Sequence, residues 1–366
     1  MDVALLAKTR FLHEEPISFR DLVVGLIDEQ VRVTQVLPDA EAERLASSFG
    51  ALATWRESAW RPVDRRRVVK LTSSFGKSPP DVVHALDGGT WSAATAWASK
   101  LGAASVLSVW SVEDVVLAPR LGRRLDPTRC VFTAATEPLR RETALQLDPA
   151  FRVELVPPGI HVGSEPAEPP ADRAPSLVVS GDGKVDAYVT RLFDGLRQVV
   201  EELPDIQVVV DTSGEPQRNL WRHVESLGLL GHVSFVPMRL DRRDLLMRSD
   251  AFVQPQPLGR ARSLVLQAMA SARPILAQRD PAVDYLIDGK TAAVVDLPDA
   301  DTWSRRLVEW ARSPSRRDAL GRSARRWVAE HRVASATVDR LLGIYRALSG
   351  EAMPFPGTPA AGAAEA

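Results

Sequence analysis

Short apolar runs alternate with stretches of helical spacing from the start of the chain. Val3–Ala7 is apolar throughout. Apolar side chains then recur at helical spacing from Ile17 to Ile27, and Ser18 is a possible helix cap. Val31–Leu37 follows, with branched side chains typical of a strand. These residues predict one strand–helix–strand unit.

The same alternation becomes regular in the second half of the chain. The pattern predicts strands at 177–180, 206–211, 233–236, 251–254, 275–277 and 292–295. It predicts helices at 186–202, 217–227, 242–247, 301–312, 315–331 and 334–348. Strands and helices that alternate at this spacing form a parallel sheet covered by helices on both faces. The fold class is therefore α/β.

One stretch of the second half also suggests chemistry. Between the predicted strands 251–254 and 275–277, a loop contains Arg260 and Arg262, and Ser263 could cap the helix that follows. Free N–H groups at such a helix start, together with two arginines, favour an anion. The alternative is a pair of solvated surface arginines, and the sequence leaves both interpretations open.

Composition limits the possible partners. The chain has 366 residues, enough for two domains of ordinary size, and a formal net charge of -1, which gives no reason to expect nucleic acid as a partner. The single cysteine, Cys130, excludes an internal disulfide and is expected to be an inert core thiol. No apolar run approaches the about 20 residues that span a bilayer. We expect a cytoplasmic protein without a transmembrane segment, metal or cofactor.

Proline and charge divide the chain into regions. Residues 164–176 are rich in both and form the best candidate for a linker. We expect one domain at 1–163, a second at 177–333, a helix at 334–349 that returns to the first domain, and a disordered tail at 350–366. We assign no role to residues 38–70.

Several of these segments resemble a known family. Leu264–Ala270, with Pro274 after it, resembles the motif "GLVLLEAMA-xG-xP" of the GT-B glycosyltransferases, especially the retaining family 4. The segments "PDVVHAL" at 80–86 and "VELVPPGIH" at 153–161 resemble two further motifs of that family. The resemblance implies two doubly wound, Rossmann-like domains that face each other across a cleft. The first would take the acceptor and the second the donor nucleotide.

The resemblance also implies a donor site, and the sequence departs from it. The family's E-x(7)-E carboxylates fall on Gly259 and Gln267, of which only Gln267 can still hydrogen-bond a hydroxyl. Gly181 and Lys184 lie in the loop where the family has a basic pair, but the spacing differs; Lys184 could instead be a solvated loop lysine. We expect the phosphate site to comprise Gly181, Lys184 and the helix-start residues Arg260, Arg262, Ser263, Leu264 and Gln267.

In the first domain, the resemblance places Trp110 and Gly159 in the wall of the cleft. Trp110 takes the position of a strand-end histidine of the family, and an apolar core role is the alternative. His84 is the only histidine of this domain in a plausible site position, and it is a weak candidate for contact with a ligand because single histidines are more often structural.

Two functions follow. The first is a glycosyltransferase that moves a sugar from a nucleotide-sugar to a glycan or lipid-linked acceptor, with metal-independent retaining chemistry. The second is a pseudoenzyme that binds a glycan, a nucleotide or a partner transferase. A shared fold supports both, because function depends on the site.

Overall fold

The computed structural model describes residues 1–39, 42, 50–55, 79–163, 174–181, 185–211, 217–236 and 242–350. They form two compact units, one from the described residues of 1–159 and 334–350, and one from those of 160–333. Lys184, most of the expected linker and nearly all of the expected tail lie outside the described residues. So does most of the segment 38–70, to which we assigned no role.

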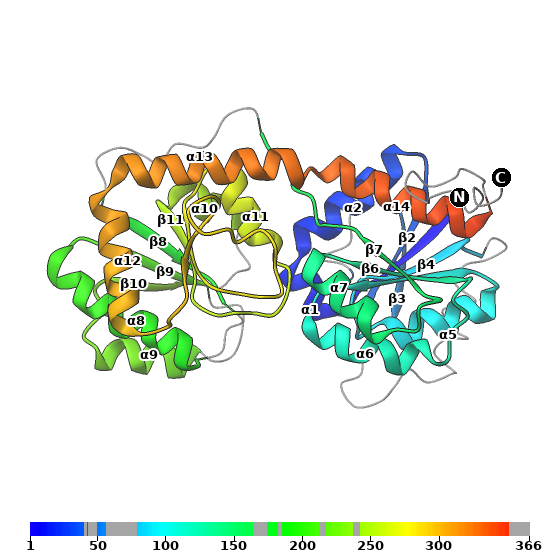
Figure 1. Cartoon of the computed structure of the whole chain (residues 1–366), viewed down its shortest axis with the longest axis horizontal. Helices are drawn as coiled ribbons and strands as arrows, with labels where there is room; N and C mark the ends of the chain where they lie inside the picture. Colours follow the sequence, from blue (N-terminus) through cyan, green and yellow to red (C-terminus); the bar gives the residue numbers. More distant parts are fainter. Residues whose placement is uncertain are drawn as a thin grey trace, which may run out of the picture. The chain divides into compact units, whose positions relative to one another are not determined.

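The first unit is built on a parallel sheet of seven strands in the order β3-β2-β1-β4-β5-β6-β7 (Figure 1). The strands are β1 (Asp2–Leu6), β2 (Arg32–Pro38), β3 (Ala51–Trp55), β4 (Val82–Ala85), β5 (Ala104–Val109), β6 (Cys130–Ala134) and β7 (Arg152–Leu155). The helices are α1 (Thr9–Glu14), α2 (Pro16–Asp28), α5 (Trp91–Leu101), α6 (Val112–Gly122), α7 (Glu137–Gln146) and α14 (Ala334–Ser349). The predicted strand–helix–strand unit is confirmed as β1, α2 and β2.

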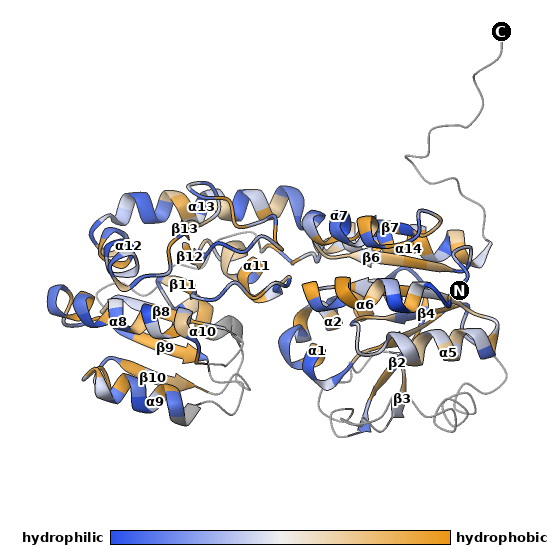
Figure 2. Ribbon diagram, turned by 60° about the horizontal axis from the view of Figure 1, so that its bottom comes forward, coloured by the Kyte–Doolittle hydropathy of each residue, from blue (hydrophilic) through white to orange (hydrophobic). Residues whose placement is uncertain are grey.

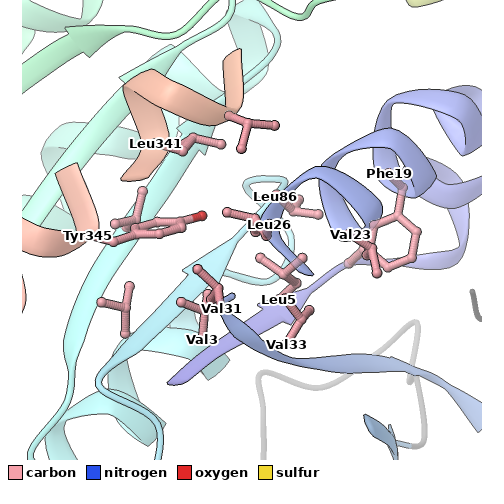
Figure 3. Close-up of a cluster of buried hydrophobic side chains, with 14 of the residues drawn as sticks. Val3, Leu5, Phe19, Val23, Leu26, Val31, Val33, Leu86, Leu341 and Tyr345 are labelled. Carbon is pink, nitrogen blue, oxygen red and sulfur yellow. The ribbon is translucent and has the colours of Figure 1, made fainter. Parts of the chain in front are cut away.

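Helices α2 and α14 cover one face of this sheet. Their apolar side chains converge on those of β1 and β2, where Leu26 and Leu341 lie above Leu5 (Figure 3). The helices approach closely at Gly25, where a Cβ would lie 2.6 Å from Cγ2 of Val338. The returning helix therefore completes the core of the first unit.

The second unit is built on a parallel sheet of six strands in the order β10-β9-β8-β11-β12-β13. The strands are β8 (Ser176–Val179), β9 (Gln207–Asp211), β10 (Val233–Val236), β11 (Ala251–Gln254), β12 (Ile275–Gln278) and β13 (Ala293–Val295). The helices are α8 (Ala187–Glu202), α9 (Gln217–Ser226), α10 (Arg242–Arg248), α11 (Ser263–Ala270), α12 (Ala300–Arg312) and α13 (Pro314–His331). The predicted strands and helices of this half of the chain are confirmed, as is the α/β class with two doubly wound units.

The helices of the second unit cover both faces of its sheet. One apolar core lies beneath α8, α9 and α12 and includes Phe193 and Trp303. The other contains the side chains of α11 and α13, including Met269 and Trp327. In Figure 2, blue segments on α12 and α13 mark their polar residues.

Two predicted helix caps are wrong. Glu15, not Ser18, is the N-cap of α2, because Pro16 begins that helix; Ser18 lies inside it, and its hydroxyl donates to the Glu15 carboxylate at 3.2 Å. Arg262, not Ser263, is the N-cap of α11, and Ser263 is the first helical residue. A serine one position inside the helix cannot accept from the first-turn N–H groups in the way that a capping residue does.

Candidate functional site

The order of the strands reverses between β8 and β11 in the second unit. Parallel sheets bind ligands beyond the carboxyl ends of their strands, at such a reversal. Here the two loops are Ser180–Gly181 after β8 and Pro255–Arg262 after β11. Gly181, Arg260, Arg262 and Ser263, four of the expected donor-site residues, therefore share one edge of the sheet.

Hydrogen bonds join these two loops. Gln256, in the loop after β11, donates from Nε2 to Oδ2 of Asp186 at 2.8 Å. Oδ1 of Asp186 in turn accepts from the N–H groups of Tyr188 and Val189, each at 3.0 Å, and so caps α8. A Cβ at Gly181 would collide with Oε1 of Gln256, so glycine allows the loops to meet. Gly181 thus has a structural role in this site.

The loop then turns at Gly259, which has a φ of 63°. Its N–H donates to Oδ2 of Asp280 at 2.9 Å, and Oδ1 of Asp280 accepts from the N–H of Ala282 at 3.0 Å. Burial raises the pKa of Asp280, and the backbone N–H groups and the charge of Arg260 oppose that shift. A carboxylate therefore lies beside the position where the family motif has its first glutamate, although it belongs to a different segment.

The start of α11 is buried and positively charged. Arg262 is 4% exposed, and its backbone N–H donates to Oη of Tyr285 at 3.0 Å. Arg260 is partly buried. The first turn of α11 contains no acidic residue, and its N-cap, Arg262, makes no side-chain cap hydrogen bond. The alternative of two solvated surface arginines is therefore wrong for Arg262.

The other expected residues of α11 are buried as well. Ser263, Leu264 and Gln267 are 1%, 2% and 9% exposed. Ser263 and Gln267 lie four positions apart and so share a helix face. Gln267 is thus on the same side of the helix as its N-terminal residue, where the amide could reach a ligand held at the helix start.

The three expected residues of the first unit line one pocket. His84, Trp110 and Gly159 border a cavity of about 50 Å³ together with side chains of α1, α2 and α14. Trp110 contacts Phe11 edge to face, with ring centroids 5.2 Å apart. Ligand pockets of proteins measure about 300–1,000 Å³. The cavity as it stands has room for water molecules, not for a sugar.

His84 belongs to a buried chain of polar groups. Its Nδ1 lies 2.5 Å from Oη of Tyr345, its Nε2 lies 2.7 Å from Oγ of Ser108, and that hydroxyl lies 2.9 Å from Oγ1 of Thr133. Burial lowers the pKa of His84 to about 3, so the ring is neutral. Both ring nitrogens have a partner, which favours the structural role.

Carboxylates join the loops at the strand reversal of the first unit, between β1 and β4. Asp87 accepts from the N–H of Lys8 at 2.9 Å, and Asp114 accepts from the N–H groups of Gly88 and Trp110 at 3.1 and 2.9 Å. Burial raises the pKa of Asp87 to about 7, the charge of Asp114 adds to the shift, and hydrogen bonds from Lys8 and Gly89 oppose it. Trp110 is therefore positioned through its backbone.

Sequence reasoning missed Asp280, Gln256 and Tyr345. Asp280 follows the predicted strand 275–277, so its place at the carboxyl edge could have been inferred. Gln256 lies in the predicted loop, but no local pattern indicates its contact with Asp186. Tyr345 is 261 residues from His84, and no spacing rule connects them.

A family match supports the resemblance to glycosyltransferases. Residues 167–327 match the family described as "Glycosyl transferases group 1". The predicted likeness to this family is thereby confirmed. The E-x(7)-E carboxylates are absent at Gly259 and Gln267. The family match covers the segment that holds α11 and its loop.

Curated relatives of the chain are glycosyltransferases. The chain is 28% identical over 132 residues to the lipopolysaccharide core biosynthesis glycosyltransferase LpsE of Rhizobium meliloti, covering 35% of this chain and 38% of that protein. It is 27% identical over 233 residues to the GDP-mannose-dependent alpha-(1-6)-phosphatidylinositol monomannoside mannosyltransferase of Mycolicibacterium smegmatis, covering 57% and 60%. The matches span less than two thirds of either relative.

Solved structures extend the likeness to nearly the whole chain. A glycosyltransferase from Rickettsia africae has a TM-score of 0.78 at 10% identity, covering 95% of this chain and 98% of that one. HepE of Anabaena, solved in complex with UDP-glucose, has a TM-score of 0.76 at 13% identity, covering 94% and 99%. The fold is therefore that of the GT-B glycosyltransferases.

Two features of the described residues concern other classes of function. No helix among them is long and apolar enough to cross a bilayer. They also contain no group of three or more His, Cys, Asp or Glu side chains that could hold a metal ion. Cys130 is buried, and burial raises its pKa to about 12, so the expectation of an inert thiol is confirmed.

Proposed function

We propose that this protein is a glycosyltransferase that takes a sugar from a nucleotide-sugar donor. The single observation that carries the proposal is the start of α11, which lies in the group 1 segment with a buried Arg262 and a partly buried Arg260. An uncapped helix start without acidic residues attracts a phosphate, and a guanidinium can form paired hydrogen bonds with one. The donor diphosphate would bind there.

The remaining donor contacts follow from the same edge of the sheet. Gly181 would allow the close approach of the diphosphate to the backbone, and Gln267 would hydrogen-bond a donor hydroxyl from α11. Lys184 would supply a further positive charge from the loop after β8. The arginines and the helix start would neutralise the diphosphate in place of a metal ion.

The finer chemistry is also part of the proposal. Transfer would proceed with retention and without metal, to a glycan or lipid-linked acceptor held by the first unit, in the cytoplasm. The HepE structure with UDP-glucose supports a nucleotide-sugar as the donor. The mannosyltransferase relative, whose name includes GDP-mannose and a phosphatidylinositol monomannoside, supports a lipid-linked acceptor.

A second candidate is a protein that binds the donor, a glycan or a partner transferase without catalysis. Gly259 and Gln267 favour it, because neither supplies the carboxylate of the family motif. Asp280 does not simply replace the first glutamate of the motif, because both of its carboxylate oxygens already accept backbone hydrogen bonds. The two candidates share the same phosphate site and differ in turnover.

Calorimetric titration with UDP, GDP and their sugar conjugates, without metal, tests the shared site. Arg260→Ala should weaken binding by about 1.5–3 kcal/mol, the usual effect of a lost charged hydrogen bond, which is about tenfold to hundredfold in Kd. Arg305→Ala, in an exposed arginine of α12, is the matched control and should bind as the wild type does. No binding of any nucleotide to the folded protein would refute the donor site.

Turnover then separates the two candidates. Release of sugar or its transfer to an acceptor by a protein that binds donor supports the enzyme; binding without either supports the second candidate. Gln267→Glu restores a carboxylate at a 9% exposed position and should tighten donor binding if α11 contacts the donor as proposed. Gly259→Glu is a poorer test, because a φ of 63° strains any side chain there.

A further inference from the structure

A second pocket lies at the opposite edge of the sheet in the second unit. It has a volume of about 280 Å³ and lies among the amino ends of β12 and β13, the end of α12 and the start of α13. Pro274 and Leu276 come from the start of β12, and Ala293 from the start of β13. Because all strands of this sheet are parallel, the pocket and the start of α11 lie at opposite strand ends. It is therefore a different site from the one proposed for the donor.

Positive charge predominates in the lining of this pocket. Three guanidinium groups line it, those of Arg306, Arg316 and Arg317, against two carboxylates, those of Asp288 and Glu309. Glu309 pairs with Arg306 at 3.5 Å and also with Arg316. Asp288 accepts from the N–H of Val294 at 2.9 Å. The lining thus carries one more positive than negative charge, and Asp318, which does not line the pocket, pairs with Arg317 at 3.6 Å.

The start of α13 adds to this positive character. Its N-cap, Ser313, makes no side-chain cap hydrogen bond, and its first turn contains no acidic residue. Arg316 and Arg317 occupy that turn instead, although a helix N-terminus is stabilised by negative charge. Arg316 already pairs with Glu309, and Arg317 pairs with Asp318 at 3.6 Å. A bound anion would share these guanidinium groups with the carboxylates and accept from the N–H groups at the helix start.

Most of the remaining lining is apolar, apart from Ser313 and Ser323. Besides Pro274 and Leu276, the pocket is bordered by Ala292, Leu320 and Trp310. Trp310 is 7% exposed, and among the described residues its indole Nε1 has no hydrogen-bond partner. The guanidinium of Arg317 lies 5.5 Å from the centroid of the indole ring. Apolar surface next to guanidinium groups suits a ligand that has an apolar body and an anionic end.

We propose that this pocket binds an organic phosphate, with the phosphate at Arg316, Arg317 and the start of α13 and the apolar body against Trp310. Phosphate fits better than a single negative charge, because it offers several acceptor oxygens to guanidinium forks and helix N–H groups. The inference does not rest on the proposed transferase activity, since it involves none of the donor-site residues.

Phenyl phosphate is a suitable probe, and the indole N–H signals of the full-length ¹⁵N-tryptophan-labelled protein are a suitable readout. The chain has nine tryptophans, and Trp310→Phe identifies the signal of Trp310 by its loss. We expect phenyl phosphate to shift that signal with saturation. Inorganic phosphate, which lacks the apolar body, should bind at least tenfold more weakly. The experiment is repeated with saturating nucleotide-sugar to keep the donor site occupied.

The paired variant Arg316→Ala/Arg317→Ala should weaken the binding of phenyl phosphate at least tenfold. Arg322→Ala/Arg326→Ala is the matched control, because both arginines are exposed on the same helix and do not line the pocket. Calorimetry on these variants gives an independent readout that does not depend on the folding of Trp310→Phe. Vesicles that contain phosphatidic acid distinguish the two sources of such a phosphate: tighter binding of vesicles indicates a lipid, and tighter binding of phenyl phosphate indicates a soluble metabolite.

Three results would overturn the inference. An unmoved Trp310 signal with both probes is the first. Equal affinity of the two paired variants is the second, since the arginines of the pocket would then contribute nothing. Displacement of phenyl phosphate by the nucleotide-sugar is the third, because the probe would then occupy the donor site. Failure of the nucleotide titration alone would refute the donor site and leave this pocket unaffected.

Discussion

The backbone N–H of Gly259 donates a hydrogen bond of 2.9 Å to Oδ2 of Asp280. The bond joins the loop after β11 to the segment after β12, at the carboxyl edge where the donor site is proposed. Asp280 is 4% exposed, so its carboxylate is shielded from solvent. The shape of the loop that carries Arg260 therefore depends on an acidic side chain from the neighbouring segment.

Asp280→Ala should destabilise the protein and weaken donor binding together. The N–H groups of Gly259 and Ala282 would lose their acceptor, and an unsatisfied buried group costs about 1–3 kcal/mol. Urea unfolding and calorimetric titration measure the two effects. Asp318→Ala, in an exposed aspartate of α13, is the control and should change neither by more than about 0.5 kcal/mol. An unchanged donor affinity in Asp280→Ala would show that the loop does not need this support.

Gly181→Ala tests the contact between the loops after β8 and β11. The added Cβ would displace Oε1 of Gln256 and disturb the hydrogen bond from Gln256 to Asp186. Because Oε1 is the end of a flexible side chain, the amide can move aside, and we expect a loss of stability of about 0.5–1.5 kcal/mol, the contribution of one hydrogen bond, together with weaker donor binding. Gly231→Ala is the matched control, since a Cβ there meets nothing within 4 Å. Equal midpoints of urea unfolding for the two variants would contradict the close approach.

The sequence predicted the second unit well because its strands and helices are short, regular and separated by clear loops. In the first unit it missed α1, α6 and β3. Helix α6 contains Pro119, which interrupts a helical pattern, although Ser111 and Asp114 form a capping box at its start. A search for that pair would have found it.

In the candidate site, too, local features were predicted and long-range contacts were not. Arg260, Arg262 and Gln267 were found because they surround one helix start, a local feature. The partners that position the loops were not, because contacts such as Gly259 with Asp280, 21 residues apart, depend on which strands become neighbours. The burial of Arg262 was not predicted either, because nothing in the neighbouring sequence distinguishes it from a surface arginine.

Tyr345→Phe should destabilise the first unit, because it removes the partner of Nδ1 of the buried His84. A buried polar group without its partner costs about 1–3 kcal/mol. Tyr188→Phe, in a partly exposed tyrosine of α8, is the control, and denaturant unfolding compares the two. If both variants unfold at the wild-type midpoint, the hydrogen bond between Tyr345 and His84 contributes nothing to stability.

The histidine itself should resist protonation. With a pKa lowered to about 3, the imidazole of His84 stays neutral from pH 8 to about pH 4, whereas an exposed histidine titrates near pH 6.5. NMR of the ring nitrogens follows each histidine separately, and His84→Gln assigns the signal. A His84 signal that titrates between pH 6 and 7 would show that the ring is accessible to solvent. His84 would then again be a candidate for contact with a ligand.

Asp87 should make the first unit less stable as the pH rises. Its pKa is about 7 in the folded protein against 3.8 for the unconstrained group, so between those values the folded state keeps a proton that the unfolded state has lost. The stabilising contribution of this proton is complete below about pH 4 and is lost as the pH rises to about 7. Asp87→Asn cannot lose that proton. The advantage of the wild type over this variant in unfolding midpoint should therefore shrink from pH 5 to pH 8. Asp126→Asn, in an exposed loop, should show no such trend over that range, and a constant difference for Asp87→Asn would place the pKa of Asp87 outside it.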